Sequence, residues 1–139
     1  MEMVTNPKIL VIDDDEDFRI SIRTLLKSKG YDVVEADSGK QGLLKIKEGR
    51  PDIILLDIMM ETMDEGYLLN QLLKFQKQYE EYKDIPVLMV SSIQDDPLSR
   101  FPSAAGQVDM IIPDYYFPKP VDIPKFLETI EKVLKKKAK

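Results

Sequence analysis

The sequence predicts an α/β domain in which a parallel sheet of five strands is covered by helices on both faces. Uniformly apolar stretches of four residues, at 9–12, 53–56 and 87–90, are typical of strands that are buried on both faces. Segments with apolar residues at helical spacing follow these stretches, and strand and helix patterns alternate five times along the chain. Such alternation indicates parallel strands joined by right-handed crossover connections.

The first strand and the first helix are defined by residues 9–30. The helix carries its core-facing stripe at positions i, i+4, i+7 and i+8, namely Phe18, Ile22, Leu25 and Leu26. Gly30 should end this helix. The acidic residues 15–17 precede the stripe, and we interpret them as a solvated run that complements the helix dipole.

A strand, a helix and the central strand of the sheet are predicted within residues 31–57. The segment 31–36 suits an outer strand, because its β-branched valines are flanked by acids. Asp37 and Ser38 can cap the next helix, which carries Leu43, Leu44 and Ile46. Gly39 and Gly42 should weaken this helix by up to about 1 kcal/mol each relative to Ala. The stretch from Pro51 to Asp57 is then predicted as the central strand, because four consecutive apolar residues run directly into the carboxylate of Asp57.

The second half of the chain continues the alternation less regularly. A long third helix, capped by Asp64, is expected from the stripe Leu68, Leu72, Phe75 and Tyr79. The strand 87–90 runs into Ser91, and a short, broken helix follows because Pro102 interrupts it. A last short strand covers 115–117. The final helix, from about 122 to 135, carries the stripe Ile123, Phe126, Leu127, Ile130, Val133 and Leu134.

Length and composition limit the class of protein. The 139 residues suit a single domain spanning 1–139. A net charge of -5 argues against direct binding of nucleic acid or of an acidic membrane surface. The chain has no Cys and no His, so its chemistry must depend on carboxylates, hydroxyls and amines. No apolar stretch is long enough to span a membrane and no signal peptide is evident, so we expect a cytoplasmic protein.

Polar side chains stand at the carboxyl ends of four predicted strands. They are Asp13 and Asp14, Asp57, Ser91, and Lys119. In open α/β sheets this edge forms the ligand site. Three carboxylates brought together there repel one another unless a cation or a proton compensates, so the pattern predicts a metal site. Taken alone, Ser91 would be a turn hydroxyl and Lys119 a surface lysine.

The ordered set of these motifs resembles the receiver domain of two-component response regulators over nearly the whole chain. The resemblance rests on Val11-Ile12-Asp13-Asp14, on the segment 51–57, on the segment 86–91, and on Lys119-Pro120 after an aromatic strand. It implies the flavodoxin-like, CheY-like strand order 2-1-3-4-5. It also implies a signalling domain rather than an enzyme, with only self-phosphorylation and self-dephosphorylation chemistry.

The resemblance also implies a role for each site residue. Asp57 would be the nucleophile that accepts a phosphoryl group, and Lys119 would pair with the phosphate. Asp14, Asp57 and the backbone carbonyl of Met59 would bind Mg²⁺, with Asp13 acting mainly through a water molecule. Ser91 would donate a hydrogen bond to the new phosphate, and the rotamer of Tyr116 would change with the position of the Ser91 hydroxyl. Taken alone, Tyr116 would be a core residue. The resemblance also places Met59 and Ile93 at the two positions that control access of the hydrolytic water in this family. Because neither side chain can orient a water molecule by hydrogen bonding, we expect slow hydrolysis of the phosphoryl group on Asp57.

The expected partners are a histidine kinase or phosphotransfer protein and a downstream protein target or a second copy of the chain. The protein would be a stand-alone regulator or an excised domain. Glu61 and Glu65, and a longer interval from Gly106 to Lys119, depart from the usual family pattern. Alternatives are a Mg²⁺-dependent phosphatase or phosphotransferase, a receiver-like interaction module that is not phosphorylated, and a flavodoxin-like nucleotide binder, which the acids 13–17 oppose.

Overall fold

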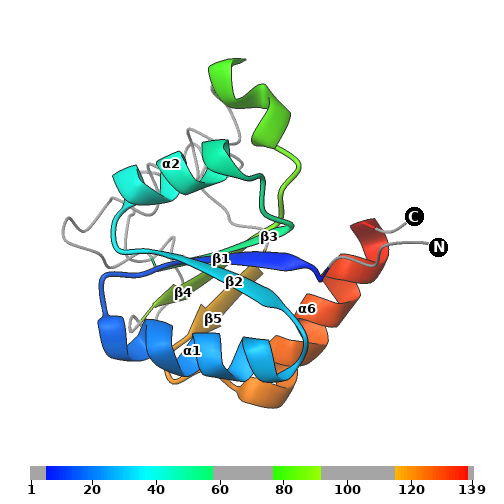
Figure 1. The fold of residues 1–139 in the computed structure, drawn as a ribbon. Helices are drawn as coiled ribbons and strands as arrows, with labels where there is room; N and C mark the ends of the chain where they lie inside the picture. The colour runs from blue at the N-terminus through cyan, green and yellow to red at the C-terminus, as the bar shows by residue number, and fades with distance from the viewer. Residues whose placement is uncertain (1–5, 58–76, 92–114, 138–139) are drawn as a thin grey trace, which may run out of the picture.

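A five-stranded parallel sheet forms the centre of the computed structural model, which describes residues 6–57, 77–91 and 115–137 (Figure 1). The strands are β1 (Lys8–Ile12), β2 (Asp32–Ala36), β3 (Ile53–Asp57), β4 (Val87–Ser91) and β5 (Tyr115–Pro118). Their order is β2-β1-β3-β4-β5, and every neighbouring pair is parallel. The predicted fold class and strand order are confirmed, and β2 lies at an edge of the sheet as expected.

Helices cover both faces of this sheet. The described helices are α1 (Glu16–Ser28), α2 (Gly39–Glu48), the 3-10 helix η1 (Lys77–Tyr82) and α6 (Ile123–Lys137). Figure 1 shows α2 and η1 on one side of the sheet and α1 and α6 on the other. Each side therefore encloses its own apolar core.

The two cores explain why residues 9–12, 53–56 and 87–90 are uniformly apolar. The first core lies under α2 and consists of Leu10, Ile12, Ala36, Ile46, Ile54, Leu56, Ile85, Val87 and Met89. The second core lies under α1 and α6 and consists of Ile9, Val11, Ile22, Leu26, Ile53, Leu55, Leu88, Val90, Phe117, Phe126, Ile130 and Val133. Successive residues of β1, β3 and β4 alternate between the two cores, as the two-residue period of a strand requires.

Side chains and one glycine set the helix ends. Asp15 caps α1 by accepting a hydrogen bond of 3.2 Å from the Phe18 N–H. Ser38 caps α2 by accepting one of 3.1 Å from the Gln41 N–H. After α1, Gly30 has a φ of 91°, a left-handed conformation that suits glycine and stops the helix as predicted.

Gly42 allows α2 to pack unusually close to β1. A Cβ atom at this position would lie 2.5 Å from Cδ1 and 3.0 Å from Cγ1 of Ile12, a residue that is fully buried. Alanine would favour the helix by about 1 kcal/mol, but it would push into this contact. The glycine that weakens the predicted helix is therefore also what allows the helix to approach the sheet.

We predict an energetic coupling between Gly42 and Ile12. Gly42→Ala should lower the free energy of unfolding in the wild-type background, because crowding against Ile12 outweighs the gain in helix propensity. In the Ile12→Val background, which lacks Cδ1, the same substitution should cost about 1 kcal/mol less. Urea unfolding of the two single variants and the double variant measures this coupling, and additive effects would contradict it.

Two expectations about helices were wrong in detail. Ile123 is 38% exposed, so it does not belong to the predicted stripe of the last helix, and Leu44, one of the apolar residues expected on α2, is 53% exposed. Ile123 is the first residue of α6, which extends to Lys137. Asp122 caps this helix, because its Oδ1 accepts a hydrogen bond from the Lys125 N–H. Tyr79 lies in η1 with φ -113°, so the α-helical pattern expected for the third helix does not extend through it. The rest of that helix, the broken helix and residues 106–114 lie outside the described residues.

Candidate functional site

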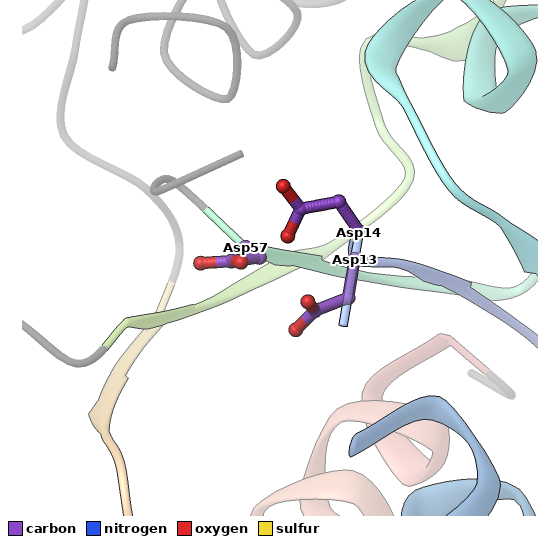
Figure 2. A group of neighbouring side chains, drawn as sticks. All are labelled: Asp13, Asp14 and Asp57. Carbon is purple, nitrogen blue, oxygen red and sulfur yellow. The ribbon is translucent and has the colours of Figure 1, made fainter. Parts of the chain in front are cut away.

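Three carboxylates meet at the carboxyl edge of the sheet. Asp13 and Asp14 directly follow β1, and Asp57 is the last residue of β3, the strand beside β1 (Figure 2). Because Ile12 pairs with Leu56 in the sheet, the acids follow in matching positions on the two strands. Each of the three residues offers a carboxylate oxygen, and these oxygens all lie within 4.8 Å of one another. The predicted cluster is therefore present.

Lys119 contributes the ammonium group that pairs with these acids. It follows β5, and its Nζ lies 2.9 Å from Oδ2 of Asp13 and 3.8 Å from Oδ2 of Asp57. The same Nζ lies 4.1 Å from the centre of the Phe18 ring, a distance suited to a cation–π interaction. One ammonium charge offsets only part of the charge of three carboxylates.

The three acids differ in their environment. Asp13 is fully buried and Asp57 is 3% exposed, whereas Asp14 is exposed. Loss of hydration, followed by the charge of Asp13, raises the pKa of the Asp14 carboxyl above its ordinary value. A hydrogen bond from the backbone and the charge of Lys119 oppose this shift only in part. The ionised carboxylate of Asp14 is thus electrostatically unfavourable here unless a further cation compensates.

The donor set fits a hard divalent cation such as Mg²⁺. All three side chains offer oxygen, and Asp14 faces solvent, so the cation could keep several of its water molecules as Mg²⁺ prefers. Asp13 has both oxygens engaged, since Oδ1 accepts a hydrogen bond of 2.8 Å from the Asp15 N–H and Oδ2 pairs with Lys119. Direct ligation by Asp13 would therefore require it to give up one of these two contacts.

Comparison with known proteins identifies the family. The sequence model of the response regulator receiver domain matches residues 9–131, which include all five strands except the first residue of β1, and all three acids. The chain belongs to the response regulator receiver domain family. Receiver domains are the signalling domains of two-component response regulators, and they generally bind Mg²⁺ at an acidic pocket of this kind.

Individual relatives agree with this assignment. The chain is 38% identical over 124 residues to Protein PilG of Pseudomonas aeruginosa, covering 89% of this chain and 84% of that protein. It is 33% identical to the DNA-binding dual master transcriptional regulator RpaA of Synechocystis sp., covering 94% of this chain but only 50% of that regulator. The crystal structure of the chemotaxis protein CheY4 of Vibrio cholerae superposes with a TM-score of 0.75 at 26% identity, covering 93% and 99% of the two chains.

The other predicted site residues of this receiver domain are placed only in part. Ser91 ends β4 one residue beyond Val90, the partner of Asp57, and Ser91 itself pairs with Pro118, which precedes Lys119. Its backbone thus stands at the edge that carries the acids and Lys119. Tyr116 lies within β5 and pairs with Met89, and its side chain, like that of Ser91, is outside what the structure describes. Met59 and Ile93 lie outside the described residues altogether.

None of the described helices is long and apolar enough to cross a membrane.

Two charged residues beside the site were not predicted from the sequence. Arg19 of α1 donates from Nη1 to the backbone carbonyl of Asp13, at 2.5 Å, and its Nε pairs with Oε1 of Glu35, at 3.2 Å. Glu35 lies in β2 between the half-buried Val34 and the buried Ala36. The available signal was a carboxylate that follows two valines directly within a predicted strand, because a half-buried charge needs a partner.

Proposed function

We propose that this receiver domain comprises all 139 residues and accepts a phosphoryl group on Asp57 from a partner histidine kinase or a small phosphodonor, in a reaction that requires Mg²⁺. The observation that carries the proposal is the position of Asp57. Asp57 lies at the carboxyl end of β3, the central strand, and its side chain is almost fully buried. It is 3.8 Å from the Lys119 ammonium and next to Asp13 and Asp14. A carboxylate in that setting is held in place and faces the groups that would stabilise an incoming anion.

The chain's own residues account for most of the proposed reaction. An oxygen of Asp57 attacks the phosphorus in line with the leaving group, the P–N bond of the donor phosphohistidine breaks, and the imidazole nitrogen keeps the electron pair. Lys119 pairs with a phosphoryl oxygen, as its compact charge beside Asp57 allows. Asp14, Asp57 and the Met59 carbonyl would hold Mg²⁺, with Asp13 acting through water. When bound, this cation offsets the charge that gathers on the phosphoryl oxygens.

The proposed output is a change of conformation that a partner protein reads. Ser91 would donate a hydrogen bond to the phosphate, and Tyr116 would follow it as the switch residue. The position of the Ser91 backbone beside β3 and β5 supports this role. The partner would be a downstream protein or a second copy of the chain.

Two rival functions would each require a sequence feature that this chain does not have. A Mg²⁺-dependent phosphatase or phosphotransferase would be expected to carry a second catalytic Asp shortly after the nucleophile, and the sequence Asp57-Ile58-Met59 lacks it. A receiver-like interaction module without phosphorylation would be expected to have lost its acids or its lysine, and all of these are present. Incubation with acetyl phosphate and Mg²⁺ tests the proposal: a mass increase of one phosphoryl group supports it, and an unchanged mass contradicts it.

Asp14 gives a prediction about stability that does not depend on phosphorylation. Because the pKa of Asp14 is raised on folding, its ionised form is less favourable in the folded protein than in the unfolded chain. Asp14→Asn should therefore stabilise the metal-free protein at neutral pH, by roughly 0.5 kcal/mol because water screens the exposed group. The gain should shrink as the pH falls through the raised pKa, where the wild-type carboxyl takes up its proton.

Urea unfolding in a chelator measures this gain. Asp17→Asn is the matched control, since Asp17 lies exposed in the first turn of α1 and favours that helix end. The control should lose a little stability where Asp14→Asn gains it. Added Mg²⁺ should stabilise the wild type and the control but not Asp14→Asn. A loss of stability in Asp14→Asn without metal would contradict the prediction.

A further inference from the structure

Arg19 connects the acidic site to the edge strand of the sheet. Its guanidinium donates to the Asp13 carbonyl with one nitrogen and pairs with Glu35 of β2 with another. The side chain of Arg19 is 15% exposed and that of Glu35 is 25% exposed, so both are largely shielded from solvent. Arg23, one helical turn further along α1, pairs with the other oxygen of Glu35 at 2.5 Å. Glu35 therefore holds Arg19 in a fixed orientation.

The carbonyl that Arg19 binds belongs to the peptide group that joins Asp13 to Asp14. The Asp13 N–H donates to the Ala36 carbonyl at 3.0 Å, and the Asp13 side chain is held by the Asp15 N–H and by Lys119. Arg19 adds a contact to the backbone carbonyl oxygen of the same residue. The orientation of this peptide group sets the direction in which the Asp14 side chain leaves the backbone.

The charge of Arg19 alone would oppose a cation site. A positive guanidinium next to Asp13 repels a divalent cation, so a direct effect of its charge would weaken Mg²⁺ binding. Glu35 offsets that charge, and the planar guanidinium keeps two hydrogen-bonding directions in a rigid fork. Charge and geometry thus predict opposite consequences when Arg19 is removed.

We propose that Arg19, held by Glu35, is a positioning residue that orients the Asp13–Asp14 peptide group so that Asp14 can bind Mg²⁺. This inference rests on the magnesium site of the proposed function. Partners that hold a metal ligand in place from outside typically change metal affinity by tenfold or more when they are removed, so we expect Arg19→Met to weaken Mg²⁺ binding on the order of tenfold. An effect of charge alone would make the binding tighter.

Calorimetric titration of the unphosphorylated protein with Mg²⁺ tests the sign of this effect. Arg23→Met is the matched control, since it removes the same charge and one contact with Glu35 but leaves the contact between Arg19 and Asp13. Its Mg²⁺ affinity should stay within about twofold of the wild type, because solvent and salt screen the more distant charge. The Asp14 amide resonance should shift in Arg19→Met and not in Arg23→Met.

Arg19→Lys provides a second test if Arg19→Met does not fold. It keeps the charge, but a single ammonium group cannot reproduce the fork between Asp13 and Glu35, so affinity should fall several-fold where a pure charge effect predicts no change. Equal or tighter Mg²⁺ binding by the Arg19 variants, with normal binding by the wild type, would overturn the positioning role alone. Failure of the wild type to bind Mg²⁺ would overturn the proposed magnesium site itself.

Discussion

Replacing Asp57 by Asn should abolish the phosphoryl adduct completely. The neutral amide oxygen of Asn is far less nucleophilic than a carboxylate, so the variant keeps the shape of the side chain and loses the attacking group. Purified protein is incubated with acetyl phosphate and Mg²⁺, and the intact mass is then measured. The wild type should gain one base-labile phosphoryl group, and Asp57→Asn should gain none.

Asp52→Asn is the matched control for this experiment. Asp52 precedes β3, at the opposite end from Asp57, and its Oδ2 accepts a hydrogen bond of 2.8 Å from the Lys8 N–H. An Asn oxygen can keep that bond, so the control should fold and should be phosphorylated as the wild type is. Undiminished labelling of Asp57→Asn would show that another residue accepts the phosphoryl group.

Replacing Lys119 by Met should destabilise the metal-free protein by about 2 to 3 kcal/mol. The substitution removes the ammonium that pairs with the buried carboxylates of Asp13 and Asp57, and breaking a buried ion pair leaves uncompensated charge in a poorly hydrated site. We expect a loss at or below the lower end of the range that is typical for breaking a buried ion pair, because the Lys119 side chain is still 20% exposed. Addition of Mg²⁺ should recover part of the loss, because a bound cation offsets the same carboxylates.

Chemical unfolding with and without Mg²⁺ measures both effects. Lys40→Met serves as the control, because Lys40 is exposed on α2 and its removal should change stability by less than about 0.5 kcal/mol. If Lys119→Met lost no more stability than Lys40→Met, the ion pairs with Asp13 and Asp57 would contribute nothing measurable. A loss that Mg²⁺ leaves unchanged would contradict the link between Lys119 and the cation site.

The sheet was predictable because its strands are buried on both faces. Runs such as Ile53 to Leu56 have no polar residue to place toward solvent, so they fit only the interior of a parallel sheet. Helix faces were less predictable, since an apolar residue does not by itself report its burial. Leu44 follows Leu43 directly, and neighbouring helical positions point about 100° apart, so the helix buries one more than the other.

The acidic cluster and Lys119 were predictable for a topological reason. The carboxyl ends of parallel strands share one edge, so residues that end or directly follow β1, β3 and β5 lie on the same side of the sheet. Arg19 and Glu35 follow no such rule. Their contact depends on how α1 packs across β1 and β2, and that packing has no periodic signature in the sequence. The roles of all the site residues, those of Asp57 and Lys119 as well as those of Ser91, Tyr116 and Met59, remain predictions.

The strand that carries Asp57 is shared by two apolar compartments. Leu55 packs on the α1 and α6 side and Leu56 on the α2 side, so the end of β3 is in close-packed contact with both helical layers. A partner protein that touches only one layer would still rest on elements packed against the strand of the proposed phosphoacceptor. The proposed phosphoacceptor strand is thus coupled by direct packing to both helical layers of the domain.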